Sequence, residues 1–446
     1  MENIAIRLDN LPLSKFHWRT SAVGGVGHAL RAINVSMLTF VLASLVDDWH
    51  LSPSDVGAIG SAGVVGMVVG VALMGNLADR YGRKAVFQVA LLIFSIGSAL
   101  SGMAWNSASL LLTRVFAGVG LGGGSPAIVT LISELSPSRY RGRMLLLLET
   151  FWVFGGALAA VVAYIVIPLW GWRVAFFVGT LPVLYTIVVA KMLPESPRFL
   201  LGRGRIVEAK KIIEEVETSC GVEIGEEAAK TTTKTARHEQ RSRIGLDELW
   251  SRRYLKRTIC LWILWFAVAY VYYGVFTWLP SLLRASGFTL VNSFQYMIII
   301  LTAQLPGCIA AAALIDKVGR KWTLTPFMFF CGVASYLFGF AKTTDSILLW
   351  GSLIAFFNLG AWGSMTAFTA EMYPTRLRST GAGWASAFGR IGGIIAPSVI
   401  GLIVGQWSGN YQLVFIVFAI INIIGALDVA ILGEETVGRS LEELAV

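Results

Sequence analysis

Charged residues are scarce in this sequence. Only 14% of its 446 residues are Asp, Glu, Lys or Arg, whereas 55% are hydrophobic. One water-soluble core of this length would not use so many apolar side chains. The composition therefore argues against an ordinary soluble protein and predicts a chain that is embedded in lipid.

Cysteine and histidine are equally rare, with four residues of each. The cysteines show neither a CxxC pair nor any spacing typical of metal ligands. We therefore interpret them as packing thiols and predict no disulfide framework, metal site or cofactor. No nucleophile with a base and no phosphate cradle can be assembled from the spacings either, so a membrane enzyme is the least expected function.

Long apolar runs separated by short polar turns fill most of the chain. A hydrocarbon core of roughly 30 Å requires about 20 apolar residues per helix. The sequence therefore predicts an all-α membrane protein with twelve transmembrane helices. The expected spans are 21–46, 56–78, 85–105, 108–132, 144–168, 172–193, 258–283, 293–315, 322–341, 346–370, 379–405 and 411–432.

The net charge of +9 is distributed unevenly along the chain. Of the 36 Lys and Arg residues, 30 lie in segments expected on the same side of the membrane as the N-terminus. Three lie on the other side, and the last three (Arg31, Arg114 and Arg390) lie inside apolar spans. The positive-inside rule therefore predicts a cell-membrane protein with both termini in the cytoplasm. This distribution gives no reason to expect a nucleic-acid partner.

Residues 194–257 interrupt the apolar pattern with 14 basic and 11 acidic residues. We predict that this segment is a cytoplasmic linker. It would join an N-terminal six-helix bundle, residues 1–193, to a C-terminal six-helix bundle with a cytoplasmic tail, residues 258–446.

Two loop segments recur at a fixed offset of 237 residues. "GNLADRYGRK" at 75–84 matches "ALIDKVGRK" at 313–321, and "SELSPSRYRGR" at 133–143 matches "AEMYPTRLRST" at 370–380. Repeated halves in a membrane protein imply a pseudo-two-fold axis along the membrane normal, with a solute path where the halves meet.

The repeated loops are predicted to act as gating elements. Asp79 could accept hydrogen bonds from a helix N-terminus and pair with a neighbouring arginine, which would latch the cytoplasmic ends of the helices. The alternative is that these charges only follow the positive-inside rule. The predicted gating residues are Asp79, Arg80, Arg83, Glu134, Arg141, Asp316, Arg320, Glu371, Arg376 and Arg378.

Together with these loops, "PESPRFLLGRGR" at 194–205 and "GEETVGRSLEEL" at 433–444 resemble the motifs of the sugar-porter-like branch of the major facilitator superfamily. The resemblance covers nearly the whole chain and implies two pseudo-symmetric six-helix bundles. The segments "RLDNLPLSKFHWR", "RVFAGVGLGGGSPA", "LLETFW" and "GRIGGIIAPSVIG" look most like the bacterial niacin permeases. They also resemble organic ion transporters more than hexose carriers. We expect a monomeric carrier.

Arg390 is the first of the charges expected inside the membrane. A charge at this depth costs at least about 2.5–3.5 kcal/mol, so it normally faces a cavity or a partner. Arg390 lies about 18 Å into its helix, near the midplane, where its guanidinium could bind a carboxylate through two hydrogen bonds. Organic anion transporters carry an arginine in this helix, so the resemblance implies an anionic substrate. A structural ion pair is the alternative.

Glu149 is expected inside the membrane as well. Removal from water favours the neutral carboxyl, which predicts proton uptake and release, unless a permanent pair with Arg114 or Arg31 keeps it ionised. By resemblance, Arg114 matches an arginine that pairs with a helix-1 aspartate in proton-coupled sugar porters. Asn34 stands in place of that aspartate, and Arg31 in place of another acid in the niacin permeases. Coupling through Glu149, another mechanism and uncoupled diffusion are therefore all open.

Aromatic and amide side chains complete the predicted pocket. Flat rings beside an arginine suit a small aromatic carboxylate, although packing or an interfacial position is the alternative for each ring. The predicted substrate-binding residues are Arg390, Tyr272, Gln304, Asn358, Trp362, Trp152, Arg31 and Asn34, and the predicted proton-coupling residues are Glu149 and Arg114.

These inferences combine into one functional prediction. We expect an alternating-access secondary transporter for a small organic anion, an aromatic monocarboxylate such as nicotinate, with protons as a candidate coupling ion. A sugar transporter of the same superfamily and a non-transporting membrane sensor are the alternatives.

Overall fold

The computed structural model describes residues 7–8, 11–137, 139–221, 248–285, 287–315, 317–373, 375–406 and 411–436. It gives no side-chain description for Leu146, Thr375, Arg376, Arg378 and Ser379. Residue Asp316, the central part of the predicted linker and the end of the predicted tail therefore lie outside the described residues. The same holds for the side chains of Arg376 and Arg378.

Twelve helical segments within these described ranges are long and apolar enough to cross a membrane, which confirms the predicted all-α fold. Ten of them are continuous: α2 (Lys15–Trp49), α3 (Pro53–Tyr81), α4 (Arg83–Gly102), α5 (Ser107–Leu135), α6 (Arg141–Trp170), α11 (Leu255–Ala285), α14 (Arg320–Gly339), α15 (Thr344–Glu371), α16 (Thr375–Gln406) and α17 (Tyr411–Leu432).

The other two spans are interrupted, although the sequence predicts each as one helix. The sixth consists of α7 (Trp172–Val178) and α8 (Pro182–Met192), and the eighth of α12 (Leu290–Thr302) and α13 (Gln304–Ile315). Proline explains both interruptions. Pro182 begins α8, and Pro306 has no N–H to donate to the carbonyl of Thr302 one turn earlier.

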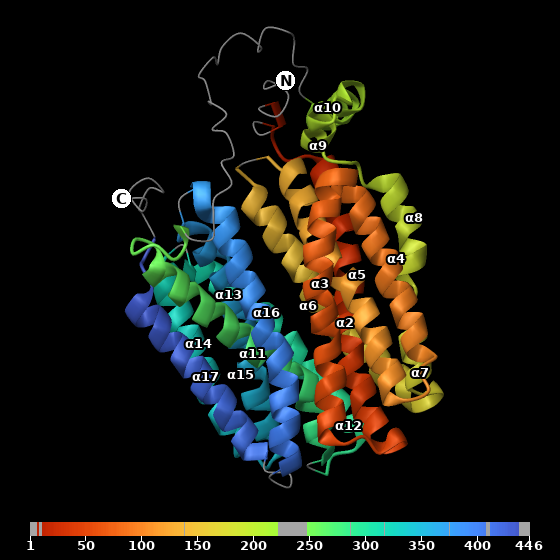
Figure 1. Ribbon diagram of the computed structural model, residues 1–446, viewed down its shortest axis with the longest axis vertical. Coiled ribbons are helices and arrows are strands. Elements are labelled where there is room, and N and C mark those ends of the chain that lie inside the picture. The colour runs from red at the N-terminus through yellow and green to blue at the C-terminus, as the bar shows by residue number, and fades with distance from the viewer. Residues whose placement is uncertain are drawn as a thin grey trace.

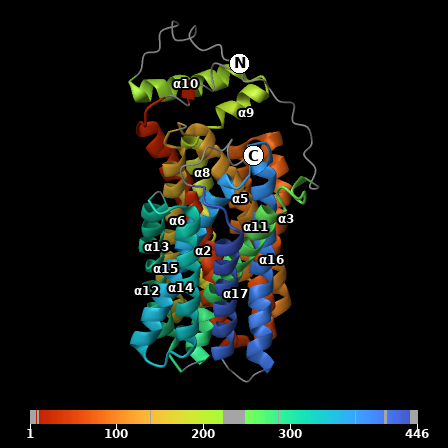
Figure 2. The same cartoon turned by 90° about the vertical axis from the view of Figure 1, so that its left-hand side faces the viewer.

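The helices form two groups that lie side by side (Figure 1). One group contains α2 to α8 and the other α11 to α17; Figure 2 shows the molecule from the side. Two short helices, α9 (Pro197–Gly202) and α10 (Ile206–Cys220), lie beyond one end of the first group. We call this end the α10 end and the opposite one the α12 end.

Helix α10 is fastened to the start of the chain. The guanidinium of Arg7 binds both carboxylate oxygens of Glu217 at 2.8 and 2.7 Å, and Arg19 pairs with Glu215 at 2.7 Å. The backbone N–H of Phe16 also donates to the hydroxyl of Ser219. These contacts join the N-terminal segment, the first transmembrane helix and α10 into one unit.

At the α12 end the two groups touch directly. Arg284 of α11 pairs with Asp47 of α2, and Gln295 of α12 donates to the hydroxyl of Tyr164 on α6 at 2.9 Å. The hydroxyl of Ser61 on α3 donates to the carbonyl of Ile394 on α16 at 2.6 Å. These polar contacts, together with close backbone packing of α3 against α16, hold the two groups together at this end.

Glycine allows that close packing. A Cβ atom on Gly57 of α3 would lie 2.7 Å from the carbonyl oxygen of Pro397 on α16. A distance this short is never tolerated, so the two helices could not approach as they do with any larger residue at this position.

Candidate functional site

A central cavity with an empty volume of about 750 Å³ lies where the two groups of helices meet. Helices of both groups contribute to its wall. The lining residues are Arg31, Met67, Ser125, Glu149, Trp152, Trp265, Ala269, Tyr272, Tyr273, Leu359, Trp362, Ser386, Gly389 and Arg390.

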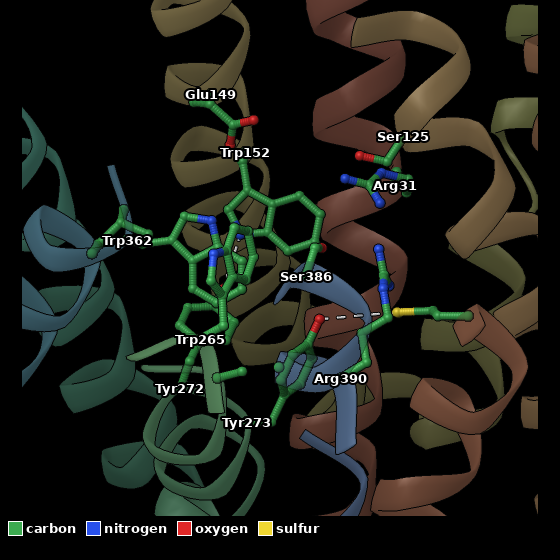
Figure 3. Close-up of a pocket in the computed structure, with 14 residues that line it drawn as sticks. Arg31, Ser125, Glu149, Trp152, Trp265, Tyr272, Tyr273, Trp362, Ser386 and Arg390 are labelled. Carbon is green, nitrogen blue, oxygen red and sulfur yellow. Dashed lines mark hydrogen bonds between the residues drawn. The ribbon is translucent and has the colours of Figure 1, made fainter. Parts of the chain in front are cut away.

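Two arginines from opposite groups reach this cavity. Arg31 comes from α2 and Arg390 from α16, and Figure 3 shows both on the same side of the cavity. The Nη1 atom of Arg31 donates to the carbonyl of Leu121 at 2.9 Å, and its guanidinium lies 4.7 Å from the ring centre of Trp152. Among the described residues, no carboxylate forms a hydrogen bond or ion pair with either guanidinium.

Glu149 is the one acidic residue among the lining side chains described above. Its side chain is 49% exposed, and one carboxylate oxygen lies 4.0 Å from Nε2 of the buried His28. His28 in turn contacts Arg31, whose Nη2 is 3.5 Å from either ring nitrogen. Glu149, His28 and Arg31 therefore form a cluster in which the carboxylate is accessible from the cavity.

Aromatic rings form the wall opposite the arginines (Figure 3). The indole N–H of Trp152 on α6 donates to the hydroxyl of Tyr272 on α11 at 2.9 Å, which links the two groups of helices. The ring of Trp362 lies 5.5 Å from that of Tyr272 and 6.0 Å from that of Trp265. Rings at these distances contact one another, so they form one continuous aromatic surface against which a flat molecule can pack.

A wider cavity connects this site to the α10 end. Its empty volume is about 1310 Å³, and Glu149, Trp152 and Trp362 belong to the walls of both cavities. It extends to Leu13 and Trp18, which lie in the segment fastened to α10. Since the two groups touch at the α12 end, the site in this structure is accessible from the α10 end.

A third, smaller cavity lies next to the central one. Met67, Tyr272 and Tyr273 line both, so the two spaces are adjacent. Arg114 lines the smaller cavity, and its Nη1 atom donates to the side-chain oxygen of Asn34 at 3.2 Å. Arg114 and Asn34 are therefore neighbours in the structure, as the resemblance implied.

The predicted substrate-binding residues fall into two sets. Five of the eight line the central cavity: Arg31, Trp152, Tyr272, Trp362 and Arg390. Glu149, which the sequence predicted for proton coupling, lines it as well. Asn34, Gln304 and Asn358 do not line it and are buried, with exposures of 1%, 2% and 1%. One polar atom of Gln304 and one of Asn358 have no hydrogen-bond partner in the described part of the chain. As substrate-binding residues these three stay predictions.

Trp265, Ser125 and Ser386 line the cavity although the sequence did not single them out. Helical spacing contains a signal for two of them. Trp265 stands seven residues before Tyr272, and Ser386 four residues before Arg390, so each shares a helix face with a residue that was predicted. No such spacing singles out Ser125.

Among the described residues, no three His, Cys, Asp or Glu side chains are grouped so as to hold a metal ion.

The predicted gating residues form an ion-pair cluster in each group of helices. Arg83 pairs with Asp79 at 3.1 Å and with Glu134 at 3.4 Å. In the second group Arg320 pairs with Glu371 at 3.0 Å. Arg141 donates to the carbonyl of Ser133, and Arg80 lies over the ring of Tyr81. The sequence indicated neither contact.

The carboxylate at the helix N-terminus is Glu195, which corrects the expectation for Asp79. Glu195 accepts the backbone N–H groups of Arg83 and Lys84 at 3.0 and 3.2 Å, whereas Asp79 is 78% exposed. Glu435 repeats the arrangement at the start of α14. The acid in each case comes from a segment that follows the last helix of its group, a long-range contact that spacing within the loop cannot reveal.

Comparison with known proteins gives a consistent result. The family model described as "Sugar (and other) transporter" matches residues 19–446. The chain is 43% identical to the niacin transporter NiaP of Acinetobacter baylyi over 100% of both chains. It is 38% identical to the putative niacin/nicotinamide transporter NiaP of Bacillus subtilis, covering 94% of this chain and 96% of that one.

Solved structures show the same architecture. A partially occluded inward-open structure of the xylose transporter XylE from E. coli superposes with a TM-score of 0.76, covering 96% of this chain and 100% of that one. The sequence identity is 18%, so this likeness supports the fold alone.

Proposed function

The chain belongs to the sugar (and other) transporter family of the major facilitator superfamily, and we propose from this premise that it carries nicotinate or a closely similar aromatic monocarboxylate. It is a multi-pass membrane protein and a secondary transporter, as the sequence predicted. The identity of the solute, its charge and the coupling ion are the proposed parts.

One observation carries the substrate proposal. Arg31 and Arg390 enter a single aromatic cavity from opposite groups of helices, and no carboxylate of the described chain pairs with either. An arginine beside flat rings is suited to a ligand that has both a carboxylate and an aromatic ring. Nicotinate has both, and relatives named as niacin transporters support this choice.

The two arginines also suggest how binding promotes movement. Like charges on opposite sides of an interface repel each other, and the repulsion grows as the groups approach in a site with little water. A carboxylate between Arg31 and Arg390 would remove this repulsion and attract both guanidinium groups. Solute binding then favours closure of the site at the α10 end, which is the step that alternating access requires.

We assign proton coupling to Glu149. Glu149 is the one carboxylate among the residues that line the central cavity, and it belongs to the same cluster as the positively charged Arg31. A bound anion neutralises that charge, so Glu149 then takes up a proton more readily. Anion and proton therefore bind cooperatively, and the carrier moves them together without net charge.

The orientation follows from the basic residues. The α10 end carries the N-terminal segment, α10 and the basic loops, so the positive-inside rule assigns it to the cytoplasm. The structure would then be the inward-open state, with the six-helix bundles at 1–193 and 258–446 joined by a cytoplasmic linker.

Uptake into proteoliposomes that contain the purified chain tests the proposal. Nicotinate should be transported, benzoate should compete, and xylose should not. Nicotinamide is the matched ligand because it keeps the ring and replaces the carboxylate by a neutral amide, so it should compete at least tenfold more weakly. Equal competition by nicotinamide would contradict the arginine clamp, and transport of xylose alone would favour the sugar transporter. Binding without counterflow would identify a sensor.

A further inference from the structure

Arg114 is a buried cation outside the central cavity. It lies on α5, is 1% exposed and donates from Nη1 and Nη2 to the side-chain and main-chain oxygens of Asn34. Its Nε atom has no partner, and no carboxylate of the described residues pairs with it. A guanidinium in the membrane without a counter-charge is costly, so this arrangement suggests an anion that is present only part of the time.

The surroundings of Arg114 fit such an anion. The small cavity that it lines also contains the hydroxyl-bearing residues Ser36 and Thr39 from α2 and Thr277 from α11. None of these three hydroxyls has a hydrogen-bond partner within the described ranges of the chain. Free hydroxyl donors around an unpaired guanidinium are the chemistry that binds a carboxylate.

The position of this cavity places it in series with the central site. Met67, Tyr272 and Tyr273 line both cavities, and the hydroxyl of Tyr273 lies 3.9 Å from the sulfur of Met67. The central cavity also shares lining residues with the wide cavity toward the α10 end, whereas Thr277 of the small cavity packs against Gly60 in the contact that closes the α12 end. An anion that enters from the α12 end would therefore meet Arg114 first.

We propose that Arg114 forms an outer binding subsite for the carboxylate of the solute. An anion entering from the α12 end binds there first, with Ser36 and Thr39 donating to its oxygens, and then passes Met67 and Tyr273 to reach Arg31 and Arg390. The inference rests on the proposed function, because it assigns the same solute to a second position. In the present structure the subsite is closed off by the contacts at the α12 end.

The subsite contributes to binding only when the α12 end is open, and this sets the test. Nicotinate binding is measured on the full chain held in each of two states by a short bifunctional thiol reagent. Asp47→Cys with Arg284→Cys holds the α12 end closed, since these side chains pair there. Leu147→Cys with Ala312→Cys is designed to hold the α10 end closed, since both residues line the wide cavity, one from α6 and the other from α13 of the second group. Both proteins also carry Cys220→Ser and Cys308→Ser.

Arg114→Gln should weaken nicotinate binding about tenfold when the α10 end is held closed, the value expected for loss of a charge-assisted hydrogen bond. It should change binding less than twofold when the α12 end is held closed. Arg114→Lys should restore part of the affinity in the first state. Thr39→Val removes a hydroxyl of the same cavity with little change of shape, and should weaken binding about threefold in that state alone.

Arg390→Gln is the control for the central site and should weaken binding in both states. An equal effect of Arg114→Gln in the two states would overturn the outer subsite, because it would indicate a structural role for Arg114. If saturating chloride abolishes the difference between the effects of Arg114→Gln in the two states, the outer subsite is also overturned. The anion that binds to Arg114 would then be inorganic. If neither state of the unsubstituted chain binds nicotinate, the proposed function fails and the subsite with it.

Discussion

The guanidinium of Arg114 donates a hydrogen bond to the side-chain oxygen of Asn34 over 3.2 Å. The two residues come from α5 and α2, 80 positions apart, and both are 1% exposed. An amide does not titrate, so this pair cannot exchange a proton as an aspartate–arginine pair can. The positive charge of Arg114 is therefore not neutralised by Asn34, and it is available to an anion.

Asn34→Asp should neutralise the charge of Arg114. The new carboxylate would pair with Arg114 and would compete with the solute at the outer subsite. We expect the KM for nicotinate uptake from the α12 end to rise about tenfold. Initial rates of uptake into proteoliposomes measure this KM. Asn34→Ser is the neutral control, and an equal KM in both variants would argue against the prediction.

Arg390→Gln should separate charge recognition from ring recognition. The substitution keeps a polar side chain and removes the positive charge, so nicotinate should bind about 10–100-fold more weakly, whereas nicotinamide should change less than threefold. Equilibrium binding of both ligands to the purified protein measures this, and the amount of protein in the membrane serves as the control for folding. An equal loss for both ligands would indicate a packing role for Arg390.

The sequence predicted those parts of the fold that depend on composition and spacing. The twelve apolar runs correspond to the twelve spans, because a membrane-spanning helix needs a minimum length of apolar residues whatever it packs against. The interruption at Ala303 was missed because Pro306 lies inside an apolar run, and a run does not show whether its hydrogen bonds continue. Hydropathy therefore gives the number of spans more reliably than their continuity.

The site was predictable where a charge in the membrane required an explanation, as for Arg31 and Arg390. It was predictable only in part for neutral residues, because Trp152, Tyr272 and Trp362 line the cavity as expected, whereas Asn34, Gln304 and Asn358 do not. Asn358 and Trp362 are one helical turn apart on α15, yet the first is buried away from the cavity and the second lines it. Residues one turn apart share a helix face, so what differs is their depth along the helix relative to the cavity, which a single sequence does not show.

Glu149→Gln should abolish accumulation driven by a proton gradient. The substituted side chain keeps a similar size and cannot take up a proton, so the cooperative binding of anion and proton is lost. Exchange of labelled for unlabelled nicotinate needs no net proton movement and should continue. Both are measured in proteoliposomes with and without a pH gradient. Glu149→Asp retains a titratable carboxyl and should accumulate solute, whereas accumulation by Glu149→Gln would move the coupling site elsewhere.

Glu195→Gln should destabilise the protein more than Asp79→Asn. Glu195 accepts the N–H groups at the start of α4, where a negative charge and a cap together contribute about 1–2 kcal/mol. Asp79 is 78% exposed, and an exposed ion pair is worth about 0–1 kcal/mol. Thermal unfolding in detergent, followed by tryptophan fluorescence, should therefore show the larger decrease in Tm for Glu195→Gln. A larger effect of Asp79→Asn would mean that the exposed pair, rather than the cap, stabilises this end.

Tyr272→Phe should shift the balance between the two access states. The hydroxyl of Tyr272 accepts a hydrogen bond from Trp152 over 2.9 Å, so the bond links the two groups of helices beside the central cavity. Separation of the groups at the α12 end would break this bond, which therefore favours the state seen here. Its loss costs that state about 0.5–1.5 kcal/mol, which corresponds to a change of about two- to tenfold in the ratio of the two states.

Cys308 is a natural reporter for this shift because it lines the wide cavity that leads to the α10 end. In a Cys220→Ser background, its rate of reaction with a water-soluble thiol reagent should fall in Tyr272→Phe, since the α10 end is open for less of the time. Tyr273→Phe is the matched control, because its hydroxyl makes only a long contact of 3.9 Å with the sulfur of Met67. If both variants slow the reaction equally, the hydrogen bond between Trp152 and Tyr272 does not set the balance, and the aromatic wall acts through packing alone.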